Sequence, residues 1–296
     1  MGVLSGLNNF GIDMGEDIYG DNKAKNNADA DARAAAAAAE AEAAHKAAEE
    51  KKKKDAEEPN YLLARSYTCP VCDKPFKSLA VKANRARVVS HDVDLRPVYD
   101  PVDSLKYNVI SCPYCGYSAL TRVFPNITNN QKKMVKEKIS SAFKPAAVIS
   151  ENGVYSYDEA LGRMQMAFAT AMATVAKSSE KAYLCLSMSW LVRGQREHLG
   201  NADPDKLEEL QMAEDELQKK ALEGFVYARQ TEDYPMCGNM DQYTVDYIIA
   251  ALFYKSKDYD KALKLLPEII VSASASRGIK DRARDLKEKI IAARSK

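Results

Sequence analysis

The sequence lacks any apolar run approaching the roughly 20 residues that a membrane-spanning helix needs, so no membrane span is expected. Residues 1–21 have neither a basic start nor a continuous apolar stretch, so no secretory signal is expected either. Charge of one sign is not in excess, because 43 Lys and Arg stand against 42 Asp and Glu, a formal net charge of +1. Contact with nucleic acid or an anionic membrane would therefore require a local basic patch.

Cysteine is scarce and unevenly placed. Four of the six cysteines form two Cys-x-x-Cys pairs, at positions 69–72 and 112–115, and the other two are isolated. This number and spacing of cysteines indicates a metal site in a reducing compartment and not a disulfide framework. We therefore expect a cytoplasmic protein.

Both cysteine pairs have the form Cys-Pro-x-Cys, which predicts two tight turns whose sulfurs face one point. Gly116 follows the second pair, where a left-handed backbone lets amide groups approach the sulfurs, and Asp73 stands in the same place after the first pair. Redox dithiols and merely buried cysteines are the alternative interpretations. The expected metal is Zn²⁺, with a single iron ion as the alternative. The four expected ligands are Cys69, Cys72, Cys112 and Cys115.

A closed set of four thiolates leaves no open coordination position, so we expect this metal to be structural and not catalytic. The two pairs lie 112 − 72 = 40 positions apart, which predicts a β insertion between them. Residues 82–93 and 107–111 are rich in Val and Ile and are expected to form short strands.

Two other features of this β region allow different functions. One candidate function is a hydrolase-like enzyme that uses His91, Asp92 and Asp94 as acid–base groups. The simpler interpretation is a solvent-facing strand end followed by a turn. The basic residues after the first cysteine pair permit phosphate contacts and hence nucleic-acid binding, against a solvated surface of mixed charge. These basic residues are Lys74, Lys77, Lys82, Arg85 and Arg87.

The first 60 residues have a different composition. Residues 28–58 are mainly Ala with Glu and Lys and lack Leu, Ile, Val and aromatic residues, which predicts a solvated helical spacer without a coiled-coil seam. Pro59 is expected to end it. Ahead of this spacer, residues 1–21 contain scattered apolar side chains and are a candidate docking peptide. The apolar residues that suggest docking are Leu4, Leu7, Phe10 and Ile12.

The C-terminal half is expected to be helical. Ser156 and Glu159 form a capping-box pattern at the start of the first of six long helices. Short connections between these helices predict antiparallel hairpins. The expected helices cover about residues 156–177, 179–199, 204–230, 240–257, 259–272 and 280–293.

The segment 250–266 resembles a tetratricopeptide-type hairpin, with the small residues Ala250 and Ala262 where the two helices cross. Lys257 and Asp258 are expected to form the turn. Stacked hairpins of this kind create grooves that bind peptides, although an inert helical bundle is an equally physical interpretation.

Several motifs occur together in one order along the chain: Cys69-Pro-Val-Cys72, Asp92-Val-Asp94-Leu-Arg-Pro97, Cys112-Pro-Tyr-Cys115-Gly-Tyr-Ser-Ala119 and Ser189-Trp-Leu-Val-Arg193. With Tyr107 and the terminal hairpin, they resemble the bacterial family known as domain of unknown function 2225, over roughly residues 66–292. The resemblance implies a four-cysteine ribbon joined to tetratricopeptide-like helices. It implies no established activity and no catalytic residues.

These observations predict an α+β protein, mainly α, in which a small four-cysteine zinc-ribbon β module precedes an antiparallel array of tetratricopeptide-like hairpins. The expected function is a non-enzymatic, zinc-binding module that docks a protein or peptide partner. The expected parts are a flexible segment 1–21, a helical linker 22–60, the β module 61–127 and the helical domain 128–296.

Overall fold

The computed structural model describes residues 57–145, 153–201 and 203–295, together with Lys46, Glu49 and Lys53. The chain divides into two units, Met1–Glu57 and Glu58–Lys296, and the description below concerns the second. The expected docking peptide at residues 1–21 lies outside the described residues, as does most of the expected linker. The described residues of that linker that precede Glu58 are helical.

Among the described residues of the second unit, three two-stranded antiparallel hairpins form the β part. Strand β1 pairs with β2 from Leu62↔Val81 to Thr68↔Pro75, and β3 pairs with β4 with an irregularity between Val88 and Ser90. The short strands β5 and β6 form the third pair. The strands are β1 Leu62–Thr68, β2 Pro75–Val81, β3 Arg87–His91, β4 Pro97–Asp100, β5 Val109–Ser111 and β6 Ser118–Leu120.

The expected strand boundaries need correction. A turn interrupts the segment 82–93, because Asn84 adopts a left-handed backbone with φ of 60°, which Asn tolerates better than most residues. Residues Ser104–Tyr107 form a 3₁₀ helix whose start is capped by the Asp103 side chain, so the next strand begins only at Val109. The expected β insertion between the cysteine pairs is confirmed as the β3–β4 hairpin.

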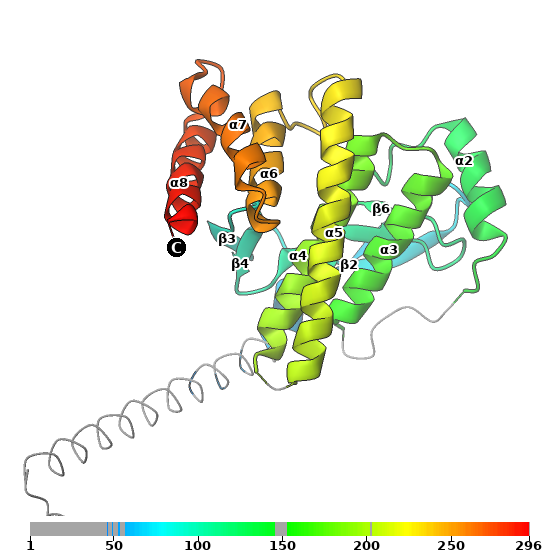
Figure 1. The fold of residues 1–296 in the computed structure, drawn as a ribbon. Helices are drawn as coiled ribbons and strands as arrows, with labels where there is room; N and C mark the ends of the chain where they lie inside the picture. Colours follow the sequence, from blue (N-terminus) through cyan, green and yellow to red (C-terminus); the bar gives the residue numbers. More distant parts are fainter. Residues whose placement is uncertain are drawn as a thin grey trace, which may run out of the picture. The chain divides into compact units, whose positions relative to one another are not determined.

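The six long helices are confirmed to within a few residues of their expected ends (Figure 1). The capping box at the start of α3 is present, with Ser156 and Glu159 bonding reciprocally. A shorter helix, α2 Asn129–Val135, precedes them and continues into a π-helical turn, Lys136–Ser140. The six long helices are α3 Tyr157–Ala173, α4 Ser178–Leu199, α5 Pro204–Thr231, α6 Gln242–Lys255, α7 Tyr259–Val271 and α8 Arg277–Arg294.

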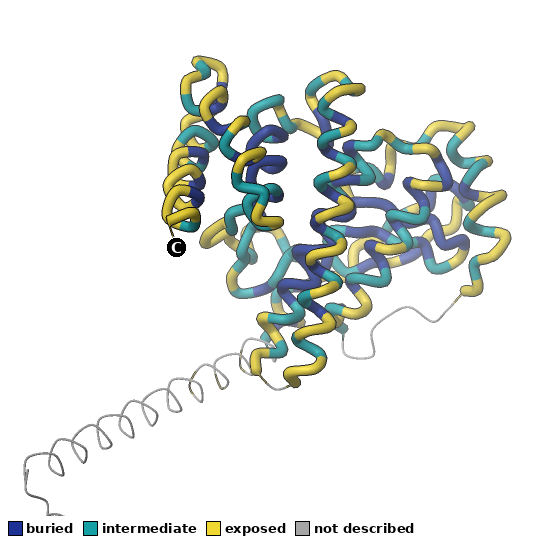
Figure 2. Tube along the Cα trace, viewed as in Figure 1, coloured by how far each residue is buried: buried dark blue, intermediate teal, exposed yellow. Residues whose placement is uncertain are grey.

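Helix α4 lies at the centre of the core, and nearly all of its residues from Ala182 to Gly194 are buried (Figure 2). Helices α3 and α5 both pack on it. The buried residues of α5 recur every three or four positions, so this helix presents one stripe to the core and its other face to solvent. That buried stripe consists of Leu210, Glu214, Gln218, Ala221, Phe225 and Ala228.

The C-terminal helices α6, α7 and α8 surround a core of their own. Ala250 and Ala262 are 0% exposed in this core, as expected for small residues at a close crossing. Lys257 turns the chain with a φ of 63°, and Asp258 caps the start of α7. A helical hairpin is therefore present at the expected place, with Pro267 inside its second helix.

The β hairpins and the helices share buried contacts. Leu105, Val109 and Leu120 belong to the same apolar cluster as the central residues of α3, α4 and α5. The third hairpin therefore lies against the helical core, and this contact fixes where its cysteine pair is held. Whether residues 61–127 and 128–296 are separate domains stays a prediction. Among the described helices, none is long and apolar enough to cross a membrane.

Candidate metal centre

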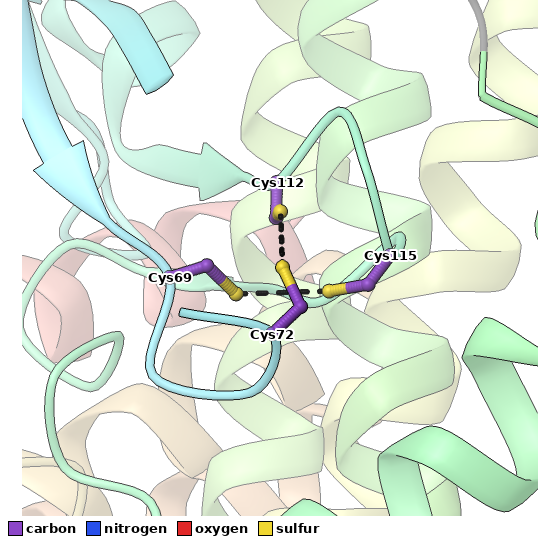
Figure 3. Close-up of side chains that lie close together, drawn as sticks. All are labelled: Cys69, Cys72, Cys112 and Cys115. Atoms are coloured by element: carbon purple, nitrogen blue, oxygen red, sulfur yellow. Dashed lines mark hydrogen bonds between the residues drawn. The ribbon is translucent and has the colours of Figure 1, made fainter. Parts of the chain in front are cut away.

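The four paired cysteines converge at the tips of two hairpins (Figure 3). Strand β1 leads into the turn that carries Cys69 and Cys72, and β2 leaves it. In the same way β5 leads into the turn that carries Cys112 and Cys115, and β6 leaves it. The fold thus brings together two local motifs that lie about 40 positions apart in the chain, as the sequence predicted.

The two turns have the same backbone construction. The amide of Cys69 donates to the carbonyl of Lys74, and that of Cys112 donates to the carbonyl of Tyr117. Asp73 and Gly116 occupy equivalent positions, each donating back to the carbonyl of the first cysteine of its pair. Both have a left-handed backbone, with φ of 60° and 74° respectively.

Gly116 is needed at its position for a second reason besides its backbone. A Cβ atom added there would lie 2.6 Å from Cδ2 of Phe143, which is closer than such contacts occur. Asp73, by contrast, is exposed and has room for its side chain. The second turn is therefore more constrained by its surroundings than the first.

The geometry of the four sulfurs fits a tetrahedral metal site. Metal–thiolate bonds of about 2.3 Å, as for zinc, require sulfurs about 3.8 Å apart along the edges of the tetrahedron. The Sγ atoms of Cys69 and Cys115 are 3.6 Å apart, as are those of Cys72 and Cys112. All four sulfurs lie within 4.8 Å of one another. These four cysteines can therefore hold a metal ion without rearrangement of the backbone.

The cysteines of the cluster shift one another's pKa values. Hydrogen bonds from Cys115 and Cys69 lower the pKa of Cys112, because its thiolate accepts them. The pKa values of Cys69 and Cys115 are raised, chiefly because their thiols donate to Cys112. Metal ions bind cysteine as the thiolate, so a bound cation would replace thiol protons of the cluster.

Backbone amides and an apolar shell complete the site. The amide of Val71 points at Sγ of Cys69 at 3.4 Å, and Ser140 donates to the carbonyl of Cys115 at 2.9 Å. Cys69 and Cys112 are almost fully buried, at 0% and 1% exposure. Such surroundings orient the ligands and keep water away, which is typical of a structural site. The apolar shell includes Phe76, Ile110, Tyr117, Phe124 and Val135.

The residues proposed for an enzymatic alternative lie elsewhere and are differently engaged. His91 is exposed, and its pKa is lowered by desolvation and by the charge of Arg282. The simpler expectation, a solvent-facing strand end, is wrong for Asp94, which is 0% exposed. Arg193 of α4 binds both aspartates: its Nη1 atom lies 3.0 Å from Asp94 Oδ1 and 2.6 Å from Asp92 Oδ2.

The contacts of Arg193 extend into an ionic network whose centre is buried and whose outer member Glu197 is exposed. Its Nε atom donates to Glu214 of α5 at 2.8 Å, and Lys255 of α6 reaches the same carboxylate at 3.3 Å. Arg96 pairs with Glu197, and Arg196 pairs with Glu214. This network joins the β3–β4 turn to α4, α5 and α6, with four acidic and four basic members. The members are Asp92, Asp94, Arg96, Arg193, Arg196, Glu197, Glu214 and Lys255.

Asp94 and Arg193 shift each other's pKa values, although both side chains are buried. Burial alone would raise the pKa of Asp94, but the hydrogen bond and charge of Arg193 outweigh it, so this pKa is lowered. Desolvation would lower the pKa of Arg193, yet Asp94 and Glu214 raise it. A buried ion pair is stable only when such partners are in place.

The pairing of these residues could not be predicted from the sequence, although two of its motifs contained some of them. Glu214 carried the one usable signal, because it falls on the buried stripe of α5 between Leu210 and Gln218. A carboxylate on an apolar stripe indicates a buried partner. The identity of that partner depends on helix packing and could not be predicted.

The basic residues of the nucleic-acid alternative are partly occupied by local contacts. Lys74 lies over the ring of Tyr114 at 5.0 Å, and Lys82 donates to the carbonyl of Asn60 at 2.8 Å. Lys77, Arg85 and Arg87 are exposed. Binding of nucleic acid stays a prediction.

The fold and the site together define an α+β protein, mainly α, with a four-cysteine cluster that can hold a metal ion. A family described as "Uncharacterized protein conserved in bacteria (DUF2225)" matches residues 62–290, and the chain belongs to this family. The resemblance of the ordered motifs is thereby confirmed. No curated protein and no solved structure matches the chain.

Proposed function

We propose that this protein is a non-enzymatic, zinc-stabilised module that binds a protein or peptide partner in the bacterial cytoplasm. The observation that carries the zinc assignment is the set of four sulfurs at tetrahedral spacing, which leaves no position for a substrate. Zinc is preferred over iron because it is the usual ion of structural four-thiolate sites. Reduced thiolates of this kind belong in a reducing compartment.

The binding role is supported by the helical part. Each helix from α3 to α8 packs against the next one along the chain, the kind of contact on which a tetratricopeptide-like array would be built. An apolar groove of about 560 Å³ lies between α3, α4 and α5. The carboxylates Asp92 and Asp94, the candidates for acid–base chemistry, are neutralised by arginine. We therefore favour a recognition surface over a catalytic site.

Metal analysis of the purified full chain tests the first part of the proposal. Elemental mass spectrometry should find one zinc ion per chain in protein produced in unsupplemented medium. This protein should be colourless. A chain with Cys69→Ser and Cys112→Ser should contain none, whereas Cys185→Ser, outside the cluster, should retain it. Stoichiometric iron with thiolate-to-iron absorption, or wild-type protein free of metal, would contradict the zinc assignment.

A further inference from the structure

The groove between α3 and α5 has helix α4 as its floor. Ala182, Cys185 and Met188 of α4 line the floor, and Phe168 of α3 forms part of one wall. Tyr227 of α5 lies on the opposite wall with 59% of its surface exposed. The groove thus combines small and flexible apolar groups with aromatic side chains, a mixture suited to the insertion of apolar side chains.

The packing of α3 and α5 on α4 leaves room for a helical occupant. Neighbouring helices pack with axes about 8–10 Å apart, and α3 and α5 both pack on α4. A further helix, about 10 Å across, can therefore lie above α4 between its two neighbours. Gly224 helps to keep the floor low, because α5 approaches α4 so closely there that an added Cβ would lie 2.8 Å from Ala182 Cβ.

The charges at the edge of the groove indicate what flanks the apolar side chains. Lys181 lines the groove near the start of α4 and makes no ion pair with any residue in the described part of the chain. Lys177, which immediately precedes α4, is exposed. Lys220, also at the edge, is already paired with Glu223 at 3.2 Å.

We propose that this groove binds an amphipathic helical peptide segment whose apolar face enters the groove and whose acidic residues meet Lys181 and Lys177. The inference rests on the proposed protein-binding role and adds the binding surface and the chemistry of the partner. Apolar side chains at helical spacing supply most of the affinity. The acidic residues fix the direction in which the segment lies.

A displayed library of random peptides of about 16 residues, roughly four helical turns, is the probe that tests this proposal. Selection on the zinc-loaded full chain should enrich peptides with apolar residues at positions i, i+4 and i+7 and with Asp or Glu at one end. Tyr227→Ala should weaken the binding of the selected peptides at least about tenfold, as expected for an aromatic anchor. Met212→Ala, an equally exposed position on α5 outside the groove, should leave binding unchanged.

Charge reversal supplies an independent measurement. Lys181→Glu should weaken the binding of acidic peptides and strengthen the binding of otherwise identical peptides that carry Lys in place of Asp and Glu. Raising the ionic strength should reduce this preference. Tyr227 and Lys181 both lie at the edge of the groove, so the two variants are expected to fold. Circular dichroism checks this.

The possible failures have different meanings. Peptides that bind equally well to the wild-type chain and to the Tyr227→Ala variant would overturn the groove while leaving the protein-binding role intact. Selected peptides without acidic residues, or without sensitivity to Lys181→Glu, would overturn the proposed chemistry of the partner. A library from which nothing is enriched would overturn the groove and the binding role together.

Discussion

Two clusters in this protein connect segments that are far apart in the chain, and they do so by different physical means. The cysteine cluster joins two short turns through four sulfurs that can share one metal ion. The ionic network joins a β turn to three helices through four acidic and four basic side chains. The first needs an ion from outside, whereas the second is neutralised by the chain itself.

The comparison shows how each cluster can lose its stability. A metal site supplies its free energy through a few bonds that all depend on one ion, so removal of a single ligand affects the whole site. In the ionic network the attraction between partners offsets the loss of hydration, so its net contribution is small while the penalty for an unpaired member is large. The following predictions test this difference, from the largest expected effect to the smallest.

Loss of the metal is expected to have the largest effect. Structural zinc contributes on the order of 10 kcal/mol to folding, so Cys112→Ser should abolish metal binding and unfold the turns between β1 and β2 and between β5 and β6. Thermal unfolding of the variant and of wild-type protein treated with a chelator should agree. Cys185→Ala is the control, because this cysteine is buried in α4 and lies outside the cluster. A chelator without effect on the unfolding temperature would contradict a structural role for the metal.

Removal of one network member should have the next largest effect. Arg193→Met leaves Asp94 and Glu214 buried without their main partner, which should lower the free energy of unfolding by about 3–5 kcal/mol. Denaturant unfolding measures this change. The matched control is Lys261→Met, which removes an exposed ion pair with Asp258 and should cost less than about 1 kcal/mol. Equal effects of the two substitutions would contradict the buried pairing of Arg193 with Asp94 and Glu214.

The two metal turns should differ in their tolerance of substitution, although their backbones match. Gly116→Ala places a methyl group against Phe143 in a left-handed conformation and should cost about 1–3 kcal/mol. Asp73→Gly relieves the same backbone conformation without a clash and should be neutral or stabilising by up to about 1 kcal/mol. Denaturant unfolding of the zinc-loaded variants separates these outcomes. A harmless Gly116→Ala would mean that Phe143 does not pack on this turn.

The smallest effect is expected from the pH dependence of the network. The pKa of Asp94 is lowered in the folded protein, so its carboxylate contributes stability above its unfolded pKa of about 3.9. That contribution is lost as the pH falls through the folded pKa, by at most about 1.4 kcal/mol per pH unit. The difference in unfolding free energy between wild type and Asp94→Asn should therefore be constant near neutral pH and shrink below about pH 4. Both proteins keep the cysteines, so the effect of metal release at low pH cancels when their unfolding free energies are subtracted. A difference in unfolding free energy that does not depend on pH would contradict an ionised Asp94.

Local patterns made much of the fold predictable. Apolar periodicity and capping residues located the six long helices, because those signals lie within one or two turns of the same segment. The strands were predicted less well, since the turn at Asn84 interrupts a segment whose composition is continuous. Strand formation depends on a partner strand, and a partner is not visible in local composition.

The sequence by itself determined the grouping of Cys69, Cys72, Cys112 and Cys115, because ligand spacing within each turn is a local property and a shared ion needs both pairs. It also determined the kind and order of the long helices. Only the tertiary structure decided that Asp94 is buried and paired with Arg193, and that α3, α4 and α5 enclose a groove. The physical reason is that these contacts depend on how separate elements pack, and their charges and volumes are complementary only after packing has brought them together.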